Sequence, residues 1–130
     1  MIMPLYLDDD IAAFDKPAGL ATIPERLPSA DSLLRAAEAA LDQRLFIVHR
    51  LDKEVSGVVL FARHAGAHRH LNNLFAGREV AKCYLLMALG EFEAAEGVIE
   101  APIRQFGSGR MGVDHLQGKP SSTSYTRLKC

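Results

Sequence analysis

The sequence predicts an α+β fold, in which a mixed but largely antiparallel sheet carries two packed helices. Short apolar, β-prone runs recur along the chain and are separated by turn residues, as in the Lys-Pro-Ala-Gly loop at 16–19. Two stretches, near 30–42 and 66–76, instead place apolar residues at helical spacing. With 130 residues, 48% of them hydrophobic, the chain is long enough for one ordinary domain. We therefore expect one domain over 1–130.

The strands are predicted in the following order. The segment LYLDDDIAAFDKPAGLAT predicts two short strands around the acidic turn at 8–10. LFIVHRLD predicts a strand that runs into a loop, and SGVVLFARH predicts a second strand, apolar enough for burial on both faces. VAKCYLLMALGEF predicts a further apolar strand leading to Gly90. Short strands are also expected at 97–100 and 123–129.

The two helices have recognisable ends and inner faces. The first lies in SADSLLRAAEAALDQR, where Ser29 or Asp31 can supply the N-cap. The second lies in AGAHRHLNNLFAGR and is expected to end near Gly77. Apolar residues at helical spacing predict the two inner faces, with Leu33, Leu34, Ala37 and Leu41 in the first helix and Leu71, Leu74 and Phe75 in the second.

Composition excludes several classes of protein. The chain has no apolar run near membrane-spanning length, so no membrane role is expected. Its N-terminus, MIMPLYLDDD, has the wrong polarity for a secretory signal, and we expect a cytoplasmic protein. The two cysteines, Cys83 and Cys130, make neither a disulfide framework nor a zinc ligand set, and are interpreted as reduced, incidental thiols.

Charge is distributed unevenly along the chain, although the net charge is only -1. Residues 1–49 carry four basic and eight acidic groups, and 50–82 carry six basic and three acidic groups. Residues 83–100 have four acids and no bases, while 101–130 have five bases and one acid. Folding could therefore gather a basic face for a nucleic-acid partner that the total does not reveal.

The segment FIVHRLDKEVSG, at 46–57, contains the main candidate for chemistry, Asp52. A carboxylate on a loop beside Arg50 and Lys53 is expected to stay ionised, because nearby cations favour the charged form. Such a group can act as a nucleophile or a general base. The alternative, favoured by spacing alone, is a loop aspartate that bonds backbone amides and pairs with Arg50.

Two other groups of residues are weaker candidates. His64 and His68 stand at i, i+4, the spacing of a metal site, but a solvated helix face is the preferred interpretation, so we expect no metal. Lys82 and Tyr84 lie on one face of the predicted strand, where a ring beside a cation suits a flat π substrate and its phosphate. A core tyrosine is about equally compatible with that pattern.

Taken together, the motifs resemble those of the RluA-type RNA pseudouridine synthases. HRLDKEVSG is similar to the family's H-R-L-D-x-x-T-S-G signature, with Val55 where the family usually has threonine. DDDIAAFDKPAGLAT looks like its opening strands and Lys-Pro-Ala-Gly loop, and LNNLFAGREVAKCYLLMALGEF like its helix, arginine and K-x-Y strand. IEAPI, RMGV and GKPSSTSY follow in the family's order. The resemblance therefore covers nearly the whole chain.

The resemblance implies a function and a role for each candidate. The family isomerises uridine in ribosomal or transfer RNA to pseudouridine, without cofactor or metal. By resemblance Asp52 is the catalytic carboxylate, Arg50 fills the space left by the flipped base and Tyr84 stacks on the uracil. Lys82 and Lys16 are assigned to RNA binding in the same way. The resemblance also implies a monomer with RNA as its partner and no separate accessory RNA-binding domain.

One family segment has no counterpart in this chain. The family normally continues with a Gly-Arg-x-His-Gln-[IL]-Arg motif, whose basic residue pairs with the catalytic aspartate. Nothing in this chain matches it, so we interpret 1–130 as the N-terminal portion of such a catalytic domain. The alternative is a non-catalytic RNA-binding fragment or remnant of such an enzyme.

Overall fold

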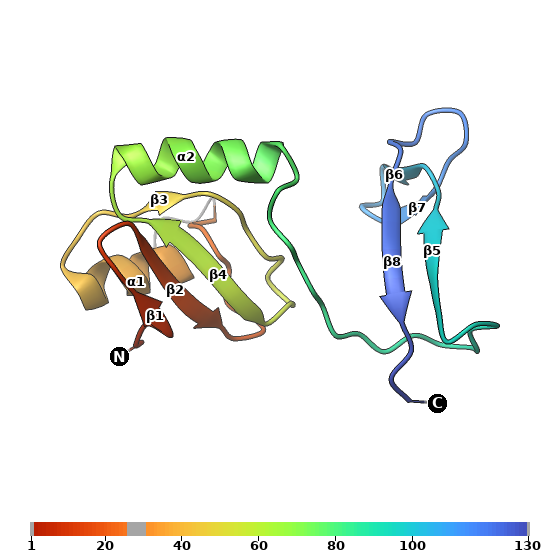
Figure 1. The fold of residues 1–130 in the computed structure, drawn as a ribbon, viewed down its shortest axis with the longest axis horizontal. Coiled ribbons are helices and arrows are strands. Elements are labelled where there is room, and N and C mark those ends of the chain that lie inside the picture. The colour runs from red at the N-terminus through yellow and green to blue at the C-terminus, as the bar shows by residue number, and fades with distance from the viewer. Residues whose placement is uncertain (1, 26–30, 130) are drawn as a thin grey trace. The chain divides into compact units, whose positions relative to one another are not determined.

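The computed structural model describes residues 2–25 and 31–129, which form two compact units. The first unit is Met1–Cys83 and the second is Tyr84–Cys130 (Figure 1). Each unit has its own antiparallel strands, and both helices belong to the first. The α+β class is confirmed. The strands are, however, divided among three antiparallel sheets instead of one mixed sheet.

A four-stranded sheet forms the centre of the first unit. Its strand order is β1-β2-β4-β3, and all neighbours are antiparallel. The longest pairing joins β2 and β4, from Ile11 opposite Ala62 to Lys16 opposite Gly57. The acidic turn before β2 is closed by Asp8, whose carboxylate accepts the backbone N–H groups of Asp10 and Ile11. The strands are β1 (Tyr6–Leu7), β2 (Ile11–Lys16), β3 (Phe46–Ile47) and β4 (Gly57–Ala62).

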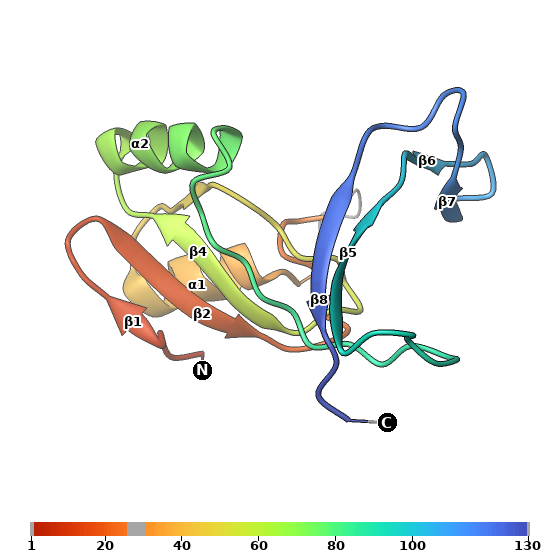
Figure 2. The same ribbon diagram turned by 45° about the vertical axis from the view of Figure 1, so that its right-hand side comes forward.

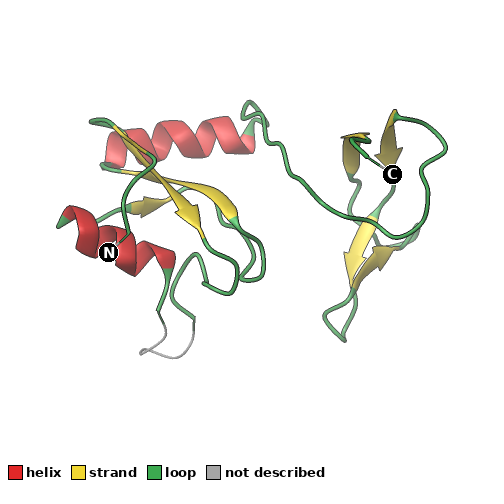
Figure 3. Ribbon diagram, turned by 90° about the horizontal axis from the view of Figure 1, so that it is seen from below, coloured by secondary structure: helices red, strands yellow, loops and turns green. Residues whose placement is uncertain are grey.

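Two helices cover opposite sides of this sheet, α1 (Leu33–Leu41) and α2 (Ala65–Ala76) (Figures 1 and 3). The N-cap of α1 is Ser32, whose hydroxyl accepts the N–H of Arg35, because its backbone is extended immediately before the helix. The prediction of Asp31 as the cap was therefore wrong by one residue, and Ser29 lies outside the described residues.

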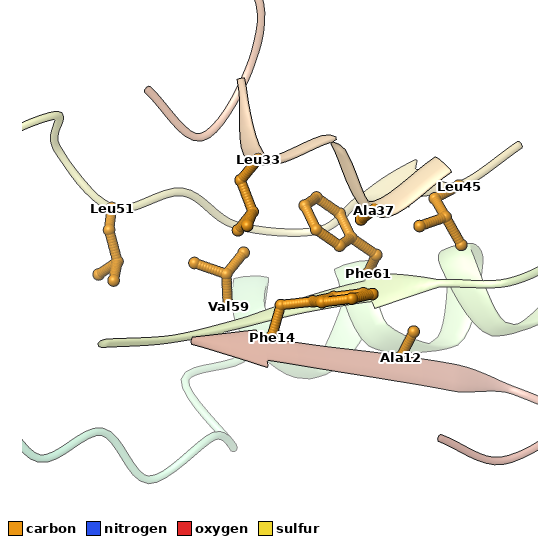
Figure 4. Close-up of a cluster of buried hydrophobic side chains, with 8 residues drawn as sticks. All are labelled: Ala12, Phe14, Leu33, Ala37, Leu45, Leu51, Val59 and Phe61. Carbon is orange, nitrogen blue, oxygen red and sulfur yellow. The ribbon is translucent and has the colours of Figure 1, made fainter. Parts of the chain in front are cut away.

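The core lies between α1 and the sheet (Figure 4). Alternate residues of β2 and β4 point to this side, which places Phe14 and Phe61 with ring centroids 6.2 Å apart. The other side of β4 is less completely buried, since Val58 is 57% exposed. The prediction of burial on both faces was therefore only partly correct. The core cluster is Ala12, Phe14, Leu33, Ala37, Leu45, Leu51, Val59 and Phe61.

The second unit consists of two antiparallel pairs of strands. β5 (Glu96–Glu100) pairs with β8 (Ser122–Thr126), and β6 (Ile103–Gln105) pairs with β7 (Met111–Val113), as Figure 2 shows. The β5–β8 pair confirms the short strands expected at 97–100 and 123–129, whereas β6 and β7 were not predicted. None of the described residues of this unit is buried.

The predicted strand over VAKCYLLMALGEF was wrong. No helix or strand is assigned over residues 80–92, and Met87 and Leu89 are fully exposed. A strand needs a neighbour for its backbone N–H and C=O groups, and no described segment pairs with this one. Apolar, β-prone composition alone was therefore not sufficient.

Candidate active-site loop

The loop between β3 and β4 presents Arg50 and Asp52 at the surface. Leu51, the residue between them, is buried in the core at 7% exposure, and its side chain points toward the sheet (Figure 4). Both charged neighbours are exposed. Burial of one residue in an extended stretch turns the side chains on either side of it outward.

Thr22 holds Leu51 in place through both of its backbone groups. The Thr22 hydroxyl donates to the Leu51 carbonyl at 2.7 Å and accepts from the Leu51 N–H at 3.1 Å. Thr22 is itself buried, at 3% exposure, so these bonds replace water that neither group can reach. The position of Leu51, and with it the direction of Arg50 and Asp52, is thus fixed from the core.

Lys16 anchors the next turn of the loop. Its ammonium is fully buried and donates to three carbonyls, those of Pro17 at 3.0 Å, Leu20 at 2.6 Å and Lys53 at 3.1 Å. An ammonium has three N–H donors, so all of them are used here. The Lys53 carbonyl also accepts the N–H of Gly19 at 2.7 Å.

This arrangement corrects the prediction that Lys16 contacts RNA. A side chain with no exposed surface and three satisfied donors has nothing left to offer a phosphate. Its position at the end of β2 lets it join the Lys-Pro-Ala-Gly loop to the backbone just after Asp52. In this structure Lys16 is a positioning residue.

His49 ties the start of the loop to β4. Its Nε2 accepts the backbone N–H of Leu60 at 2.9 Å, which requires an unprotonated Nε2. Burial, and then the positive charge of Lys82, lower the pKa of His49 below its usual value. Both effects favour the neutral ring that this bond needs.

A ring from α2 holds the other side of His49. The Phe75 and His49 rings stack with centroids 4.8 Å apart and planes inclined by 16°. The Lys82 ammonium lies 5.9 Å from the centre of the same Phe75 ring, within the range of a cation–π contact. This contact keeps the Lys82 charge beside the stack that supports the loop. Lys82 is exposed, so its charge remains open to solvent.

The loop therefore alternates between anchored and presented residues. His49, Leu51 and Lys53 are each bonded to the body of the unit, while Arg50 and Asp52 point away from it. Within the described residues the Asp52 carboxylate has no hydrogen bond or ion pair, so the alternative of a purely structural pair with Arg50 is not observed. A positioned carboxylate without a protein partner can act as a nucleophile or a general base.

The last predicted site residue, Tyr84, is the first residue of the second unit and is 56% exposed. Its segment is not a strand, so the expected shared face with Lys82 has no regular backbone behind it. The phenol is open to solvent and is not packed in a core. The core alternative that the sequence left open is therefore not observed.

The histidines at helical spacing do not form a metal site. His64 caps α2, since its Nδ1 accepts the N–H of Ala67, and its Nε2 meets the Asp10 carboxylate at 2.7 Å. His68 instead contacts the carbonyl of Ile47 at 3.0 Å. Across residues 2–25 and 31–129 no group of three or more potential ligands could hold a metal ion.

Two functional features were missed at the level of sequence. Thr22 is the third residue after Gly19 of the Pro-Ala-Gly turn. Only its hydrogen bonds to the Leu51 backbone reveal its role. Phe75 was predicted only as part of an apolar stripe, yet its ring joins His49 to Lys82. In neither case does residue type alone indicate the long-range partner.

Comparison with known proteins identifies the family. The family model described as RNA pseudouridylate synthase matches residues 10–130. The chain belongs to this family. No helix in the described part of the chain is long and apolar enough to cross a membrane.

Curated relatives of this family match almost the whole chain. The Dual-specificity RNA pseudouridine synthase RluA of Vibrio vulnificus is 33% identical over 127 residues, covering 96% of this chain and 51% of the relative. The protein of the same name from Escherichia coli (strain K12) is 36% identical over 124 residues, covering 93% and 56%. The chain thus spans about half the length of the curated relatives it matches.

Solved structures show the same fold. Human RNA Pseudouridylate Synthase Domain Containing 1 superposes with a TM-score of 0.75 at 23% identity, covering 95% of this chain and 51% of that one. Human RNA Pseudouridylate Synthase Domain Containing 4 gives a TM-score of 0.65 at 24% identity, covering 95% and 52%. At these identities the likeness concerns the fold.

Proposed function

We propose that this chain supplies the aspartate-bearing portion of an enzyme that isomerises uridine in structured RNA to pseudouridine. The reaction breaks the bond from C1′ to N1, turns the uracil and forms a bond from C1′ to C5. The C5 proton is lost and N1 gains one, so the step needs no oxidant or reductant. Ribosomal and transfer RNA are the proposed substrates, and the matched relatives in Vibrio and Escherichia carry the words dual-specificity in their names.

The observation that carries this proposal is the alternation of the loop. Asp52 is held at a fixed place by anchors on both sides, yet its carboxylate is exposed and has no partner in the described residues. A reaction that needs one carboxylate close to sugar and base is well served by such a group, because positioning lowers the entropic part of the barrier.

The other predicted residues take roles that match their exposure. Arg50 lies two residues before Asp52 and is exposed, so it can enter the space that a flipped base leaves in the RNA. Lys82 can meet a phosphate while it remains over the Phe75 ring. Tyr84 offers an open phenol ring for stacking on uracil. We further propose a monomer that works in the cytoplasm.

Release of tritium from RNA labelled at C5 of uridine tests this function, because C5 loses its hydrogen only when the new bond forms. The chain is assayed alone and as a chimera, in which residues 1–130 precede the C-terminal part of the Escherichia coli relative that the match leaves uncovered. We expect weak or no release by the chain alone. The chimera should release tritium, and Asp52→Asn should lower its rate by about 10²–10⁴-fold.

Two outcomes would contradict the proposal. A chimera that folds and binds RNA but releases no tritium would favour the non-catalytic RNA-binding alternative. Release that survives Asp52→Asn would move the chemistry to another residue. Glu54→Gln, which neutralises a second exposed carboxylate of the same loop, serves as the matched control and should leave the rate unchanged.

A further inference from the structure

The outer surface of α2 differs in charge from the rest of the first unit. From residue 55 to residue 78 the chain has three arginines and no aspartate or glutamate. Arg63 is already occupied, since its guanidinium donates to Gln43 and to the carbonyl of Asp8. Arg69 and Arg78 are exposed and have no side-chain partner among the described residues. Two cations are therefore available on a helix that itself contains no acid. The nearest acids are at its two ends, where Asp10 pairs with His64 and the Glu79 carboxylate lies close to Gly77.

Arg78 has a backbone that its side chain does not favour. It follows the helix cap Gly77 and adopts φ +56°, whereas Gly77 itself has φ -77°. The helix ends there with two backward bonds, from the N–H of Arg78 to the Phe75 carbonyl and from the N–H of Glu79 to the Leu74 carbonyl. Such an ending usually has glycine at the left-handed residue. Backbone preference does not explain an arginine at this position, so its guanidinium is a candidate for a functional contact.

The other helix provides a direct contrast. α1 also ends with a left-handed residue, Asp42 at φ +46°, and the next N–H, from Gln43, bonds back to the Glu38 carbonyl. Aspartate tolerates this conformation better than most residues. The left-handed residue at the end of the helix is thus an acid, Asp42, for α1 and a base, Arg78, for α2 on the other side of the sheet.

The end of α2 is joined to the candidate active-site loop. Phe75, in the last turn of the helix, stacks on His49, which immediately precedes Arg50. Lys82 lies over the outer part of the same stack. The outer surface of α2 is therefore connected to the residues that present Asp52, and all of these contacts lie within the first unit.

We propose that this surface, called here the α2 face, binds the phosphate backbone of the substrate RNA beside the flipped nucleotide. The inference rests on the proposed function and adds the site where the RNA strand is held. Arg78 and Arg69 supply the charges, and two exposed amides between them supply neutral hydrogen bonds to phosphate and sugar. The α2 face consists of Arg69, Asn72, Asn73 and Arg78.

RNA suits this face better than an acidic protein does. The other exposed residues of α2 are small or polar, so a sugar-phosphate backbone can approach closely; they are Ala65, Gly66, His70 and Ala76. Apart from the polar imidazole of His70, α2 exposes no ring or long aliphatic side chain of the kind that anchors protein interfaces. Its charges and amides match the groups that usually hold phosphates without reading sequence.

Binding of a fluorescein-labelled stem-loop RNA with uridines in its loop tests the proposal over a range of salt concentrations. We expect Arg78→Gly and Arg69→Gln each to weaken binding and to reduce the slope of log affinity against log salt by about 0.7–0.9. Arg78→Gly should not lower the unfolding temperature, because glycine suits the left-handed backbone. Loss of RNA binding without loss of stability is the expected signature.

Two matched variants on α1 provide the controls. Asp42→Gly makes the same backbone change as Arg78→Gly and should leave the salt slope unchanged. Arg35→Gln removes one positive charge from the opposite helix and should also leave the slope unchanged. A drop for Arg35→Gln equal to that for Arg69→Gln would reduce the effect to overall charge and overturn the proposal.

The proposal is also overturned if Arg78→Gly keeps its RNA affinity and salt slope. Polyglutamate serves as a second probe, and variants that lose polyglutamate while keeping RNA would assign the face to an acidic protein instead. The test reads binding and does not need turnover, so it is independent of Asp52. A chimera without tritium release but with the expected change in slope would refute the proposed function and leave the α2 face standing.

Discussion

The two units of this protein differ in what holds them together. The first has a buried core between α1 and the β1-β2-β4-β3 sheet, and its loop is fixed by bonds made inside that core. The second has no buried residue in its described part, and its strands are joined by ladders and surface contacts. Long-range positioning of a side chain requires anchors that water cannot replace, and among the described residues these anchors lie in the first unit.

Truncating one aromatic ring in each unit should give the largest contrast. Phe61 is fully buried, so Phe61→Ala should lower the free energy of unfolding by about 3–5 kcal/mol. The rings of Phe92 and Tyr125 have centroids 4.5 Å apart and are only half-buried, so Phe92→Ala should cost only about 0.5–1.5 kcal/mol. Urea unfolding measures both. Equal losses would contradict the division into a cored and an uncored unit.

Removing one polar anchor from each unit should give a smaller difference. Thr22→Val keeps the side-chain shape but leaves both buried backbone groups of Leu51 unpaired, which should cost about 1–3 kcal/mol. Asp114, which accepts two backbone N–H groups and pairs with Arg104 at 3.0 Å, closes the turn after β7. Asp114→Asn should destabilise less than Thr22→Val. Hydrogen exchange should show faster exchange of the Leu51 amide only in Thr22→Val.

The stack behind the candidate active-site loop should show a still smaller effect on stability. Phe75→Leu keeps an apolar side chain but removes the aromatic ring that stacks on His49 and lies under the Lys82 ammonium. The free energy of unfolding should fall by about 0.5–1.5 kcal/mol. Phe46, which lies between His68 and Arg44, makes the same kinds of contact away from the loop, so Phe46→Leu is the control. Tritium release by the chimera should fall only for Phe75→Leu. Equal activity of the two variants would remove Phe75 from the positioning residues.

Acid should affect the two units at different pH. Burial and the charge of Lys82 lower the pKa of His49. As the pH falls, the His49 ring is therefore protonated in the unfolded state before it is protonated in the folded state. Its contribution to stability is present above about pH 6.5 and is lost as pH falls below that value. The pKa of Asp114 is lowered by bonds from the N–H of Gln117 and from Arg104, so its contribution is lost only below its ordinary value of 3.8. NMR titration of His49 above pH 6.5 would contradict this order.

Residue patterns predicted the parts of the fold that depend on local chemistry. The hairpin around the acidic turn, both helices, and strands β5 and β8 follow from turn residues, capping groups and periodicity. The strand predicted over 80–92 failed because a strand also requires a neighbour, which periodicity does not supply. The cap of α1 was misplaced by one residue for a local reason, since both Asp31 and Ser32 are suitable caps.

The candidate site was predicted in part. The sequence singled out Arg50 and Asp52, and the structure exposes both on either side of the buried Leu51. Lys16 was misassigned because a lysine in a Pro-Gly loop gives no sign of burial, and its three carbonyl partners come from separate parts of the chain. The role of Thr22 depends on a partner 29 residues away and could not be found from spacing.

We propose that the loop separates the residues that hold it in place from Asp52, which reacts with the substrate. This division is tested most directly by measuring tritium release and the free energy of unfolding together for Asp52→Asn in the chimera. We predict a loss of release of about 10²–10⁴-fold with stability unchanged within about 0.5 kcal/mol. Retained release, or a loss that comes with an equal loss of stability, would contradict the claim.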